Sequence, residues 1–302
     1  MERIRSIIVP TDFSAQSQAA TARAVSLACL DGASIHLVHA VRFPLVVSPY
    51  EVSVPSAVWE GVRLAAQEKL EEAREAIEGK GVPTVTADIP ESGDPVHAIA
   101  AAVEAHEADL VVMGTHGHSG LKHAFLGSVA ERTLRTLDLP VLAVKEDTAK
   151  AEEPITRILL AVDFSVHSDR AVEVTADLGS RLKANVDVIH AFDLPRDYIP
   201  YASAFGVSLE QKIQAYANER LDGVRQRLEE CGVPVKLHAR RGLPSVVIAE
   251  VALEVGCQLI IMGTRGNSGL SHVLLGSVAE RTLRMAPCSV LTVKAQESQS
   301  GE

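Results

Sequence analysis

The sequence predicts an α/β protein built from two tandem copies of one doubly wound domain, each with a five-stranded parallel sheet. The segment Gly127–Arg135 recurs letter for letter as Gly276–Arg284, which indicates an internal duplication. Within each copy, short aliphatic runs alternate with segments of helical periodicity, as in right-handed βαβ units. The composition is 47% hydrophobic but only 4% aromatic, which favours parallel strands buried under helices.

The spacing of the repeats defines two domains. Asp12-Phe-Ser recurs 151 residues later as Asp163-Phe-Ser, whereas Gly114 and Gly263 are 149 residues apart. One two-residue gap, between Pro83 and Gly93, explains the whole alignment. The repeat is therefore as long as a domain, and it predicts domains over residues 1–146 and 155–295. The charged stretch between them predicts a linker over residues 147–154, and residues 296–302 are expected to form a flexible tail.

Each element of the first half follows from its local pattern. The apolar run Ile4–Pro10 predicts a buried strand, and alanines at helical spacing predict a helix over Ser14–Leu30. Asp94 is expected to cap the helix that begins at Pro95. The same reasoning predicts further strands over Ser34–Val41, Val82–Ile89, Asp109–Met113 and Val141–Val144, and helices over Trp59–Glu78, Pro95–His106 and Ser128–Leu137.

The second half repeats this order from the strand Arg157–Val162 to the strand Val290–Val293. Prolines make residues 42–58 an irregular excursion, and residues 192–207 form the corresponding excursion of the second half, with a different sequence. The offset between the halves is the same before and after these excursions. We expect these excursions to be places where recognition differs between the halves.

A glycine-rich loop follows the fourth strand of each half. It has the pattern G-x2-G-x9-G-S, formed by Gly114, Gly117, Gly127 and Ser128 and again by Gly263, Gly266, Gly276 and Ser277. It has neither the GK[ST] of a P-loop nor the spacing of a dinucleotide fingerprint. Glycines allow a tight turn and close approach of a ligand, and the N–H groups that open the next helix favour an anion. The loop is therefore expected to bind phosphates.

A structural role is the alternative for several of these residues. Ser128 and Glu131 match a capping box, so Ser128 could simply cap its helix. Asp12 and Asp163 could likewise be N-caps of the helices that follow them. We prefer a ligand-binding role for both aspartates, because each directly follows a strand.

These residues resemble those of the universal stress protein family. The resemblance rests on Ile7-Ile-Val-Pro-Thr-Asp-Phe-Ser and Ile158-Leu-Leu-Ala-Val-Asp-Phe-Ser, on the two glycine loops, and on the closing strands Pro140-Val-Leu-Ala-Val and Cys288-Ser-Val-Leu-Thr-Val. The resemblance covers nearly the whole chain, and the chain as a whole is similar to the tandem form of the family. It implies a sheet order of 3-2-1-4-5 in each half, in a fold like that of the adenine nucleotide α-hydrolases.

The resemblance also implies ATP, with Mg²⁺, as the ligand. Carried over residue by residue, Asp12 and Ala40 would lie at the adenine end of the first site, and Asp163 and Ala191 at that of the second. The glycine loops would hold the phosphates. The sheet order agrees with the spacing, because Asp12 and Gly114 share a ligand only if strands one and four are neighbours. Open α/β sheets bind ligands at that switch point.

Charge and cysteine content exclude several classes of protein. The net charge of −10 disfavours nucleic-acid binding, and no apolar run is long enough to span a membrane. The dispersed cysteines Cys29, Cys231, Cys257 and Cys288 are expected to be buried free thiols of a cytoplasmic protein.

The glycine loops also carry basic and histidine side chains: His116, His118, Lys122, His123, Arg265 and His272. Without a completing Cys or carboxylate they are expected to face solvent or phosphate, not a metal.

The leading hypothesis is an ATP-binding, nucleotide-dependent switch or partner-binding module of the stress response. The protein partner is unknown. The first alternative is a slow ATPase or phosphotransferase, although no residue suggests a positioned catalytic base. The second alternative is a small-ligand-binding scaffold with vestigial nucleotide pockets. The two halves are expected to pack as an internal pseudo-dimer through their last strands, so any homodimer would use another surface.

Overall fold

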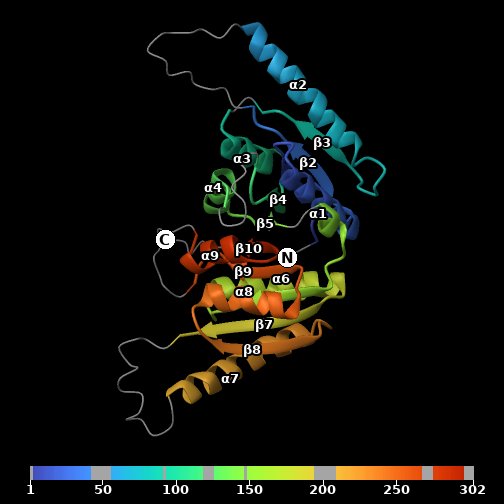
Figure 1. Cartoon of the computed structure of the whole chain (residues 1–302). Coiled ribbons are helices and arrows are strands. Elements are labelled where there is room, and N and C mark those ends of the chain that lie inside the picture. The colour runs from blue at the N-terminus through green and yellow to red at the C-terminus, as the bar shows by residue number, and fades with distance from the viewer. Residues whose placement is uncertain are drawn as a thin grey trace, which may run out of the picture.

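The α/β prediction is confirmed by the structure. A computed structural model of the chain describes residues 3–41, 56–90, 93–117, 126–145, 148–193, 209–266 and 275–295. In these residues strands and helices alternate, and neighbouring strands within each half run parallel. Figure 1 shows the two halves stacked, with the last strand of each at the centre.

The ten described strands form one continuous sheet in the order β3-β2-β1-β4-β5-β10-β9-β6-β7-β8. Each half by itself therefore has the order 3-2-1-4-5. The strands of the first half are β1 (Ser6–Pro10), β2 (Ser34–Val38), β3 (Val85–Asp88), β4 (Leu110–Gly114) and β5 (Val141–Val144). Those of the second half are β6 (Arg157–Ala161), β7 (Asn185–Phe192), β8 (Val235–Arg241), β9 (Leu259–Gly263) and β10 (Ser289–Val293).

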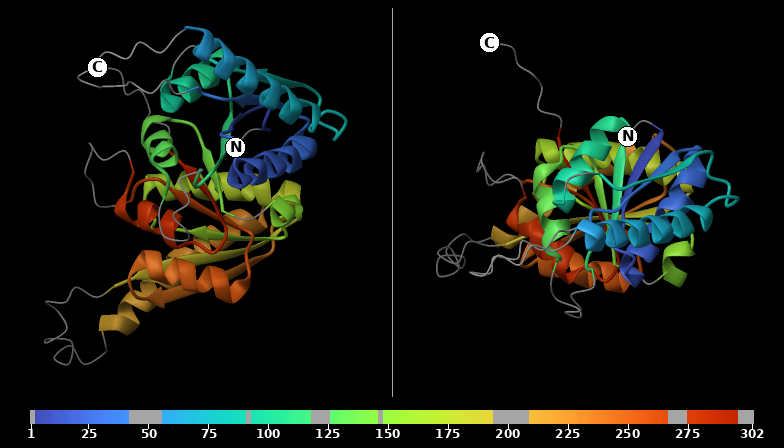
Figure 2. Two further views of the ribbon diagram at one scale, coloured as in Figure 1. Left: turned by 45° about the horizontal axis from the view of Figure 1, so that its top comes forward. Right: turned by 90° about the horizontal axis from the view of Figure 1, so that it is seen from above.

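Helices cover both faces of the sheet, as Figure 2 shows from two further directions. One apolar core underlies α1 (Ala15–Asp31), α2 (Ser56–Glu75), α5 (Thr148–Glu152), α6 (Val166–Leu182) and α7 (Leu209–Glu229). The other underlies α3 (Pro95–Ala105), α4 (Ser128–Thr136), α8 (Pro244–Val255) and α9 (Ser277–Met285). Ile7 and Val9 face the first core and Ile8 the second, which is why the strand has no polar alternation.

The two halves meet through their last strands, as expected. β5 and β10 pair antiparallel, with Leu142 opposite Leu291, and the Thr292 hydroxyl donates to the Val141 carbonyl at 3.2 Å. Each strand thereby covers the apolar edge of the other. Both apolar cores contain residues from both halves, so the chain has one hydrophobic interior on each face of the sheet.

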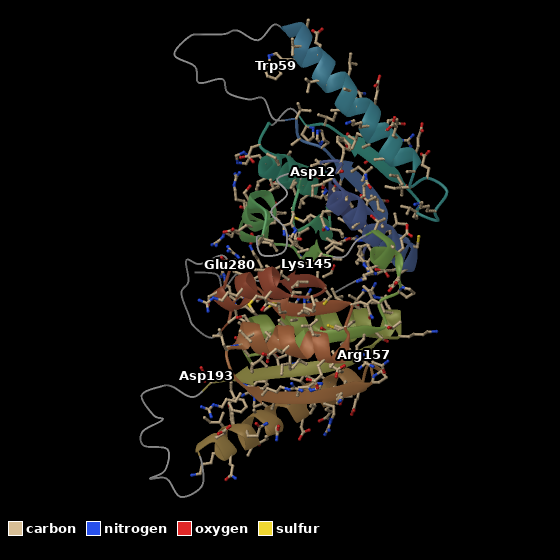
Figure 3. The ribbon with its side chains drawn as sticks, viewed as in Figure 1. Asp12, Trp59, Lys145, Arg157, Asp193 and Glu280 are labelled. Carbon is tan, nitrogen blue, oxygen red and sulfur yellow. The ribbon has the colours of Figure 1, made fainter. Side chains whose placement is uncertain are left out.

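Two lysines extend this junction reciprocally. The Lys145 ammonium donates to the Arg284 and Ala286 carbonyls at the end of α9, at 2.9 and 2.7 Å. The Lys294 ammonium donates to the Arg135 carbonyl at the end of α4, at 3.2 Å. A cation is favourable there because helix C-termini carry partial negative charge. Each helix is thus stabilised by a lysine of the opposite half; Figure 3 labels Lys145 near the middle of the molecule.

The connection between the halves is a short helix. Within residues 147–154, which the sequence predicts to be a linker, residues 148–152 form α5, and Ala151 is fully buried. The buried Arg23 side chain of α1 donates to the Glu153 and Lys150 carbonyls at 2.7 and 3.0 Å. The end of α5 is therefore held by a guanidinium distant in sequence, which no local apolar pattern reveals.

Several expectations differ from the structure in detail or lie outside the described residues. The four cysteines are free, but only Cys257 and Cys288 are buried, because Cys29 and Cys231 lie at exposed helix ends. Most of both excursions, the tail, and His118, Lys122, His123 and His272 fall outside the described ranges. No described helix combines the length and apolar character needed to cross a membrane.

Candidate functional site

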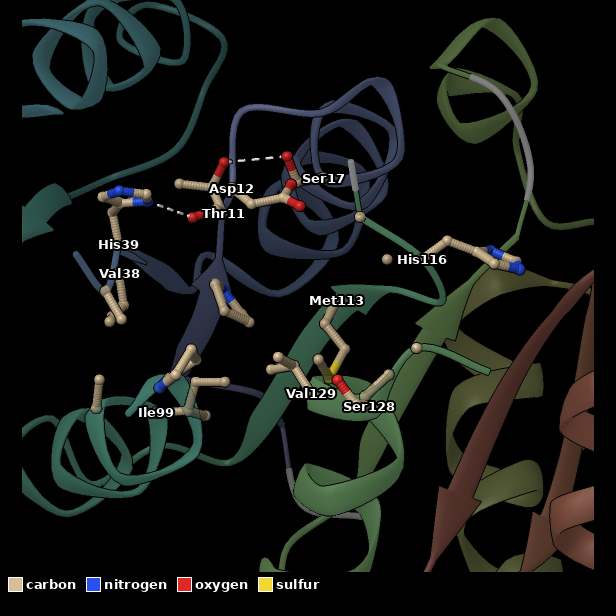
Figure 4. A pocket seen from close by; sticks show the side chains of 18 of the residues that line it. Thr11, Asp12, Ser17, Val38, His39, Ile99, Met113, His116, Ser128 and Val129 are labelled. Carbon is tan, nitrogen blue, oxygen red and sulfur yellow. Dashed lines mark hydrogen bonds between the residues drawn. The ribbon is translucent and has the colours of Figure 1, made fainter. Parts of the chain in front are cut away.

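A cavity of about 420 Å³ opens at the carboxyl ends of β1 and β4, where the winding of the first half reverses. Residues from both strands, from α3 and from the start of α4 surround it (Figure 4). All six residues that the sequence assigns to the first site line it: Asp12, Ala40, Gly114, Gly117, Gly127 and Ser128. The structure therefore brings these residues together, although they are spread over more than a hundred positions of the chain.

Asp12 does not cap the following helix. The N-cap of α1 is Ser14, whose hydroxyl accepts a hydrogen bond from the Ser17 N–H at 3.2 Å. Ser14 in turn donates from its N–H and hydroxyl to Asp12 Oδ1, at 3.1 and 2.5 Å. The intervening Phe13 is held at φ 64°, a strained conformation for a bulky residue. The N-cap alternative is thus wrong for Asp12; this tight turn presents its carboxylate at the cavity.

The loop glycines are required for close approach. None of Gly114, Gly117 and Gly127 has a positive φ, so a left-handed turn is not the reason for glycine. A Cβ on Gly117 would collide with Asp12 Oδ2, and one on Gly114 would lie 3.0 Å from the Gln16 backbone. A Cβ on Gly127 would lie 3.0 Å from the Thr115 carbonyl, which accepts the Gly127 N–H at 2.7 Å. Glycine therefore allows close packing of this loop against the turn after β1 at Gly117, against the start of α1 at Gly114 and against its own backbone at Gly127.

The first turn of α4 faces the cavity without a side-chain cap. Gly127 is the N-cap and has no side chain to accept a hydrogen bond, while Ser128, Val129 and Ala130 line the cavity. The capping-box alternative for Ser128 and Glu131 is therefore wrong. The first N–H groups of a helix have no partner within it, and the helix dipole adds positive potential there. This end of the cavity suits an anion.

The opposite end of the cavity is apolar. Val38, Ala40 and Ile99 line it, and Figure 4 shows Val38 and Ile99 on the side away from Ser128. His39 lies beside them, where its Nδ1 bonds to the Thr11 carbonyl at 2.8 Å and its ring packs on Phe13. His39 is therefore a packed, hydrogen-bonded histidine. A ligand with a flat apolar group and an anionic group fits such a cavity.

The second half repeats this geometry. A cavity of about 260 Å³ is lined by all six residues assigned to the second site: Asp163, Ala191, Gly263, Gly266, Gly276 and Ser277. Ser165 caps α6 and donates to Asp163 Oδ1 at 3.1 and 2.6 Å, and Phe164 has φ 61°. His190 Nδ1 donates to the Val162 carbonyl at 2.8 Å, and burial lowers the pKa of this imidazole.

Of the histidines in the first glycine loop, His116 lies within the described residues. His116 Nδ1 lies 2.7 Å from the Thr115 hydroxyl, and Figure 4 shows its ring directed away from Asp12. Within the described part of the chain, no three His, Cys, Asp or Glu side chains are grouped closely enough to hold a metal ion.

An ion-pair network joins α4 and α9 and was not predicted from the sequence. Arg135 contacts both Glu131 and Glu280, at 3.0 and 3.1 Å, and Arg284 contacts Glu280 at 2.7 Å and Glu131 at 3.7 Å. These residues belong to the repeated GSVAERTLR segment. They lie within about two turns of the N-terminus of α4 or α9, the helix ends that face the two cavities. The identity of the two segments was the available signal, because equivalent residues meet across a two-fold junction.

Comparison with known proteins identifies the family. The model of the universal stress protein family matches residues 3–145 and again residues 154–294. The chain belongs to the universal stress protein family. A universal stress protein of Mycolicibacterium smegmatis is 29% identical over 294 residues, which cover 95% of this chain and 96% of the relative. One from Mycobacterium tuberculosis is 27% identical over 296 residues, with the same coverage.

The solved structures agree on the fold. The crystal structure of a universal stress protein from Archaeoglobus fulgidus covers 97% of each chain with a TM-score of 0.68 and 24% sequence identity. The relatives match this chain over nearly their full lengths, and the family model matches it twice. The chain therefore has the tandem organisation that its internal duplication predicts.

Proposed function

We propose that this tandem universal stress protein binds ATP at the carboxyl end of its sheet and acts as a nucleotide-dependent switch or partner-binding module. The observation that carries the proposal is the uncapped first turn of α4, which faces a cavity whose opposite wall is apolar. An adenine ring would lie against Val38, Ala40 and Ile99, near the Asp12 carboxylate. The phosphates would accept hydrogen bonds from the first N–H groups of α4 and from the Ser128 hydroxyl.

Mg²⁺ would be held mainly by the nucleotide. Asp12 is the only carboxylate among the described residues that line the first cavity, and Ser14 occupies its Oδ1. Protein-bound Mg²⁺ commonly keeps several waters and is shared between one or two carboxylates and the substrate phosphates. The residues present are compatible with that arrangement, in which the metal neutralises phosphate charge.

The site favours binding over turnover. Hydrolysis needs a group that orients or deprotonates the attacking water beside the terminal phosphate. Asp12 is fixed by Ser14, and His39 directs its Nδ1 to a backbone carbonyl. The slow ATPase or phosphotransferase remains the alternative, and a small-ligand scaffold with vestigial pockets is the outcome if no nucleotide binds.

The remaining parts of the proposal concern context. We place the two universal stress protein domains at residues 1–146 and 155–295 and the protein in the cytoplasm, with an unidentified protein as the partner of the switch. Because β5 and β10 are already paired, a homodimer would use another surface.

The decisive experiment introduces charge at the start of α4. Ser128→Asp puts a carboxylate at a position that the helix dipole favours, so α4 is preserved while phosphates are repelled. Ser128→Asn has nearly the same size without the charge. Titration calorimetry with ATP is expected to show strong loss of binding for Asp and near-normal binding for Asn. Equal ATP affinity in all three proteins would contradict phosphate binding at α4.

Mass analysis of the small molecules released by denaturing freshly purified protein supplements the titration. Bound adenine nucleotide supports the proposal directly. A different retained ligand, together with no ATP binding by calorimetry, would favour the scaffold alternative.

A further inference from the structure

The two cavities are unequal in volume. The first measures about 420 Å³ and the second about 260 Å³. Every described residue that lines the second cavity has a counterpart lining the first, whereas His39 and Ala98 line the first only. Pockets for small organic ligands typically measure about 300–1,000 Å³, so the first lies within this range and the second below it.

The difference arises at the apolar end. Ile189 of β7 replaces Val38 of β2 and carries one carbon more, and Val247 of α8 replaces Ala98 of α3 and carries two more. Ile189 and Val247 are 1% and 4% exposed and belong to the same apolar core. Ile189 lines the second cavity as Val38 lines the first, but the second cavity does not extend to Val247, whereas the first extends to Ala98.

Val247 has little freedom to move aside. A Cβ built on Gly242, which follows β8 at φ 146°, would lie 2.8 Å from Val247 Cγ2. The β7–β8 pairing also continues to Phe192 and Arg241, and the Gly242 N–H donates to the Phe192 carbonyl at 2.9 Å. The wall behind Val247 is therefore a hydrogen-bonded ladder that resists widening of the pocket.

The anionic end differs much less. Asp163, the three loop glycines and Ser277 are retained, and Gly276 leaves the first turn of α9 uncapped, as Gly127 does for α4. Among the described residues that line the two cavities, the one change in charge is Arg265 in place of His116. Arg265 is therefore the described side chain to test for a difference in phosphate binding, and Ile189 and Val247 are those to test for a difference in base binding.

We propose that the two pockets differ in specificity: the first accepts a purine nucleotide with its base buried, and Ile189 and Val247 exclude the base from the second. This inference rests on the proposed ATP binding and deepens it. One nucleotide binds per chain, in the first half. In each half, the size of two buried aliphatic side chains decides whether the pocket accepts or excludes the purine base.

Reciprocal exchange of these side chains tests the proposal. Calorimetry of the full-length wild type with ATP is expected to give one site per chain. The variant Ile189→Val/Val247→Ala is expected to bind a second ATP. The variant Val38→Ile/Ala98→Val is expected to bind ATP about 10–200-fold more weakly, the effect of small misfits in an apolar pocket. Thermal unfolding of each variant verifies that it is folded, and the two exchanges test the idea independently.

Arg265→His is the matched control for charge. If size decides, this variant keeps one ATP per chain, and Arg265→His added to the enlarged second pocket still binds two. A wild type with two sites of equal affinity would overturn the inference while leaving ATP binding intact. A second site gained through Arg265→His alone would also overturn it. No ATP binding in any variant, the enlarged one included, would overturn this inference and the proposed function together.

Discussion

A single methyl group at Gly117 tests whether the glycine loop is built around Asp12. In Gly117→Ala the new Cβ would collide with Asp12 Oδ2, so the carboxylate or the loop must move. Moving Asp12 endangers its two hydrogen bonds from Ser14, each worth about 0.5–1.5 kcal/mol. Overpacking of this kind costs about 1–3 kcal/mol. We therefore expect the free energy of unfolding to fall by ~1–3 kcal/mol.

ATP binding should weaken together with stability. If Asp12 contacts the nucleotide, its displacement is expected to weaken binding by at least about tenfold, equivalent to ~1.4 kcal/mol. Urea unfolding and titration calorimetry measure the two effects. Gly61→Ala in α2 is the matched control, because its Cβ would meet no atom within 4 Å. Gly61→Ala should change the free energy of ATP binding by no more than about 0.5 kcal/mol. It should not lower the free energy of unfolding, because alanine has the higher helix propensity.

A double-mutant cycle separates the collision from a general loop defect. In an Asp12→Ala background the carboxylate is gone, so adding Gly117→Ala should cost at least about 1 kcal/mol less in unfolding free energy than it does in the wild type. Equal costs in both backgrounds would refute the reasoning, since the methyl group would then act without Asp12.

Three further predictions concern other parts of the chain. In Leu142→Cys/Leu291→Cys, oxidation should give a disulfide within one chain, seen as faster migration on a non-reducing gel; crosslinks only between chains would refute the internal pairing. Because burial lowers the pKa of His190, stability should fall as the pH drops below about 6.5, where the unfolded imidazole gains its proton first. Urea unfolding of His190→Gln should show a shallower pH dependence. Phosphate release from Mg·ATP should stay well below the roughly 1–100 s⁻¹ of kinases, and a rate in that range would favour the enzyme alternative.

The candidate site was predictable from sequence because its residues follow strands. Asp12 and Gly114 each directly follow an aliphatic run, and the strand order places those runs side by side at one edge. The reason for glycine at position 117 was less accessible. The sequence predicts a tight turn and close approach of a ligand, and the structure adds a steric reason that depends on where the Asp12 carboxylate lies.

Contacts between distant segments account for what the sequence did not reveal. α5 is short and weakly patterned, and the guanidinium that holds it comes from Arg23, in the opposite part of the sequence. Lys145 and Lys294 are recognisable as equivalent residues, yet their roles appear only when each meets a helix end of the other half. Val247 packs closely against Gly242, a contact that no linear pattern encodes.

The helix that joins the two halves has a genetic consequence. In a symmetric dimer of a one-domain protein, every mutation appears in both pockets at once, so the two sites are bound to evolve as one. With α5 joining the halves, a single codon change alters one pocket and leaves the other as a working copy. The pairs Val38 and Ile189, and Ala98 and Val247, are positions where the two halves differ in this independent way.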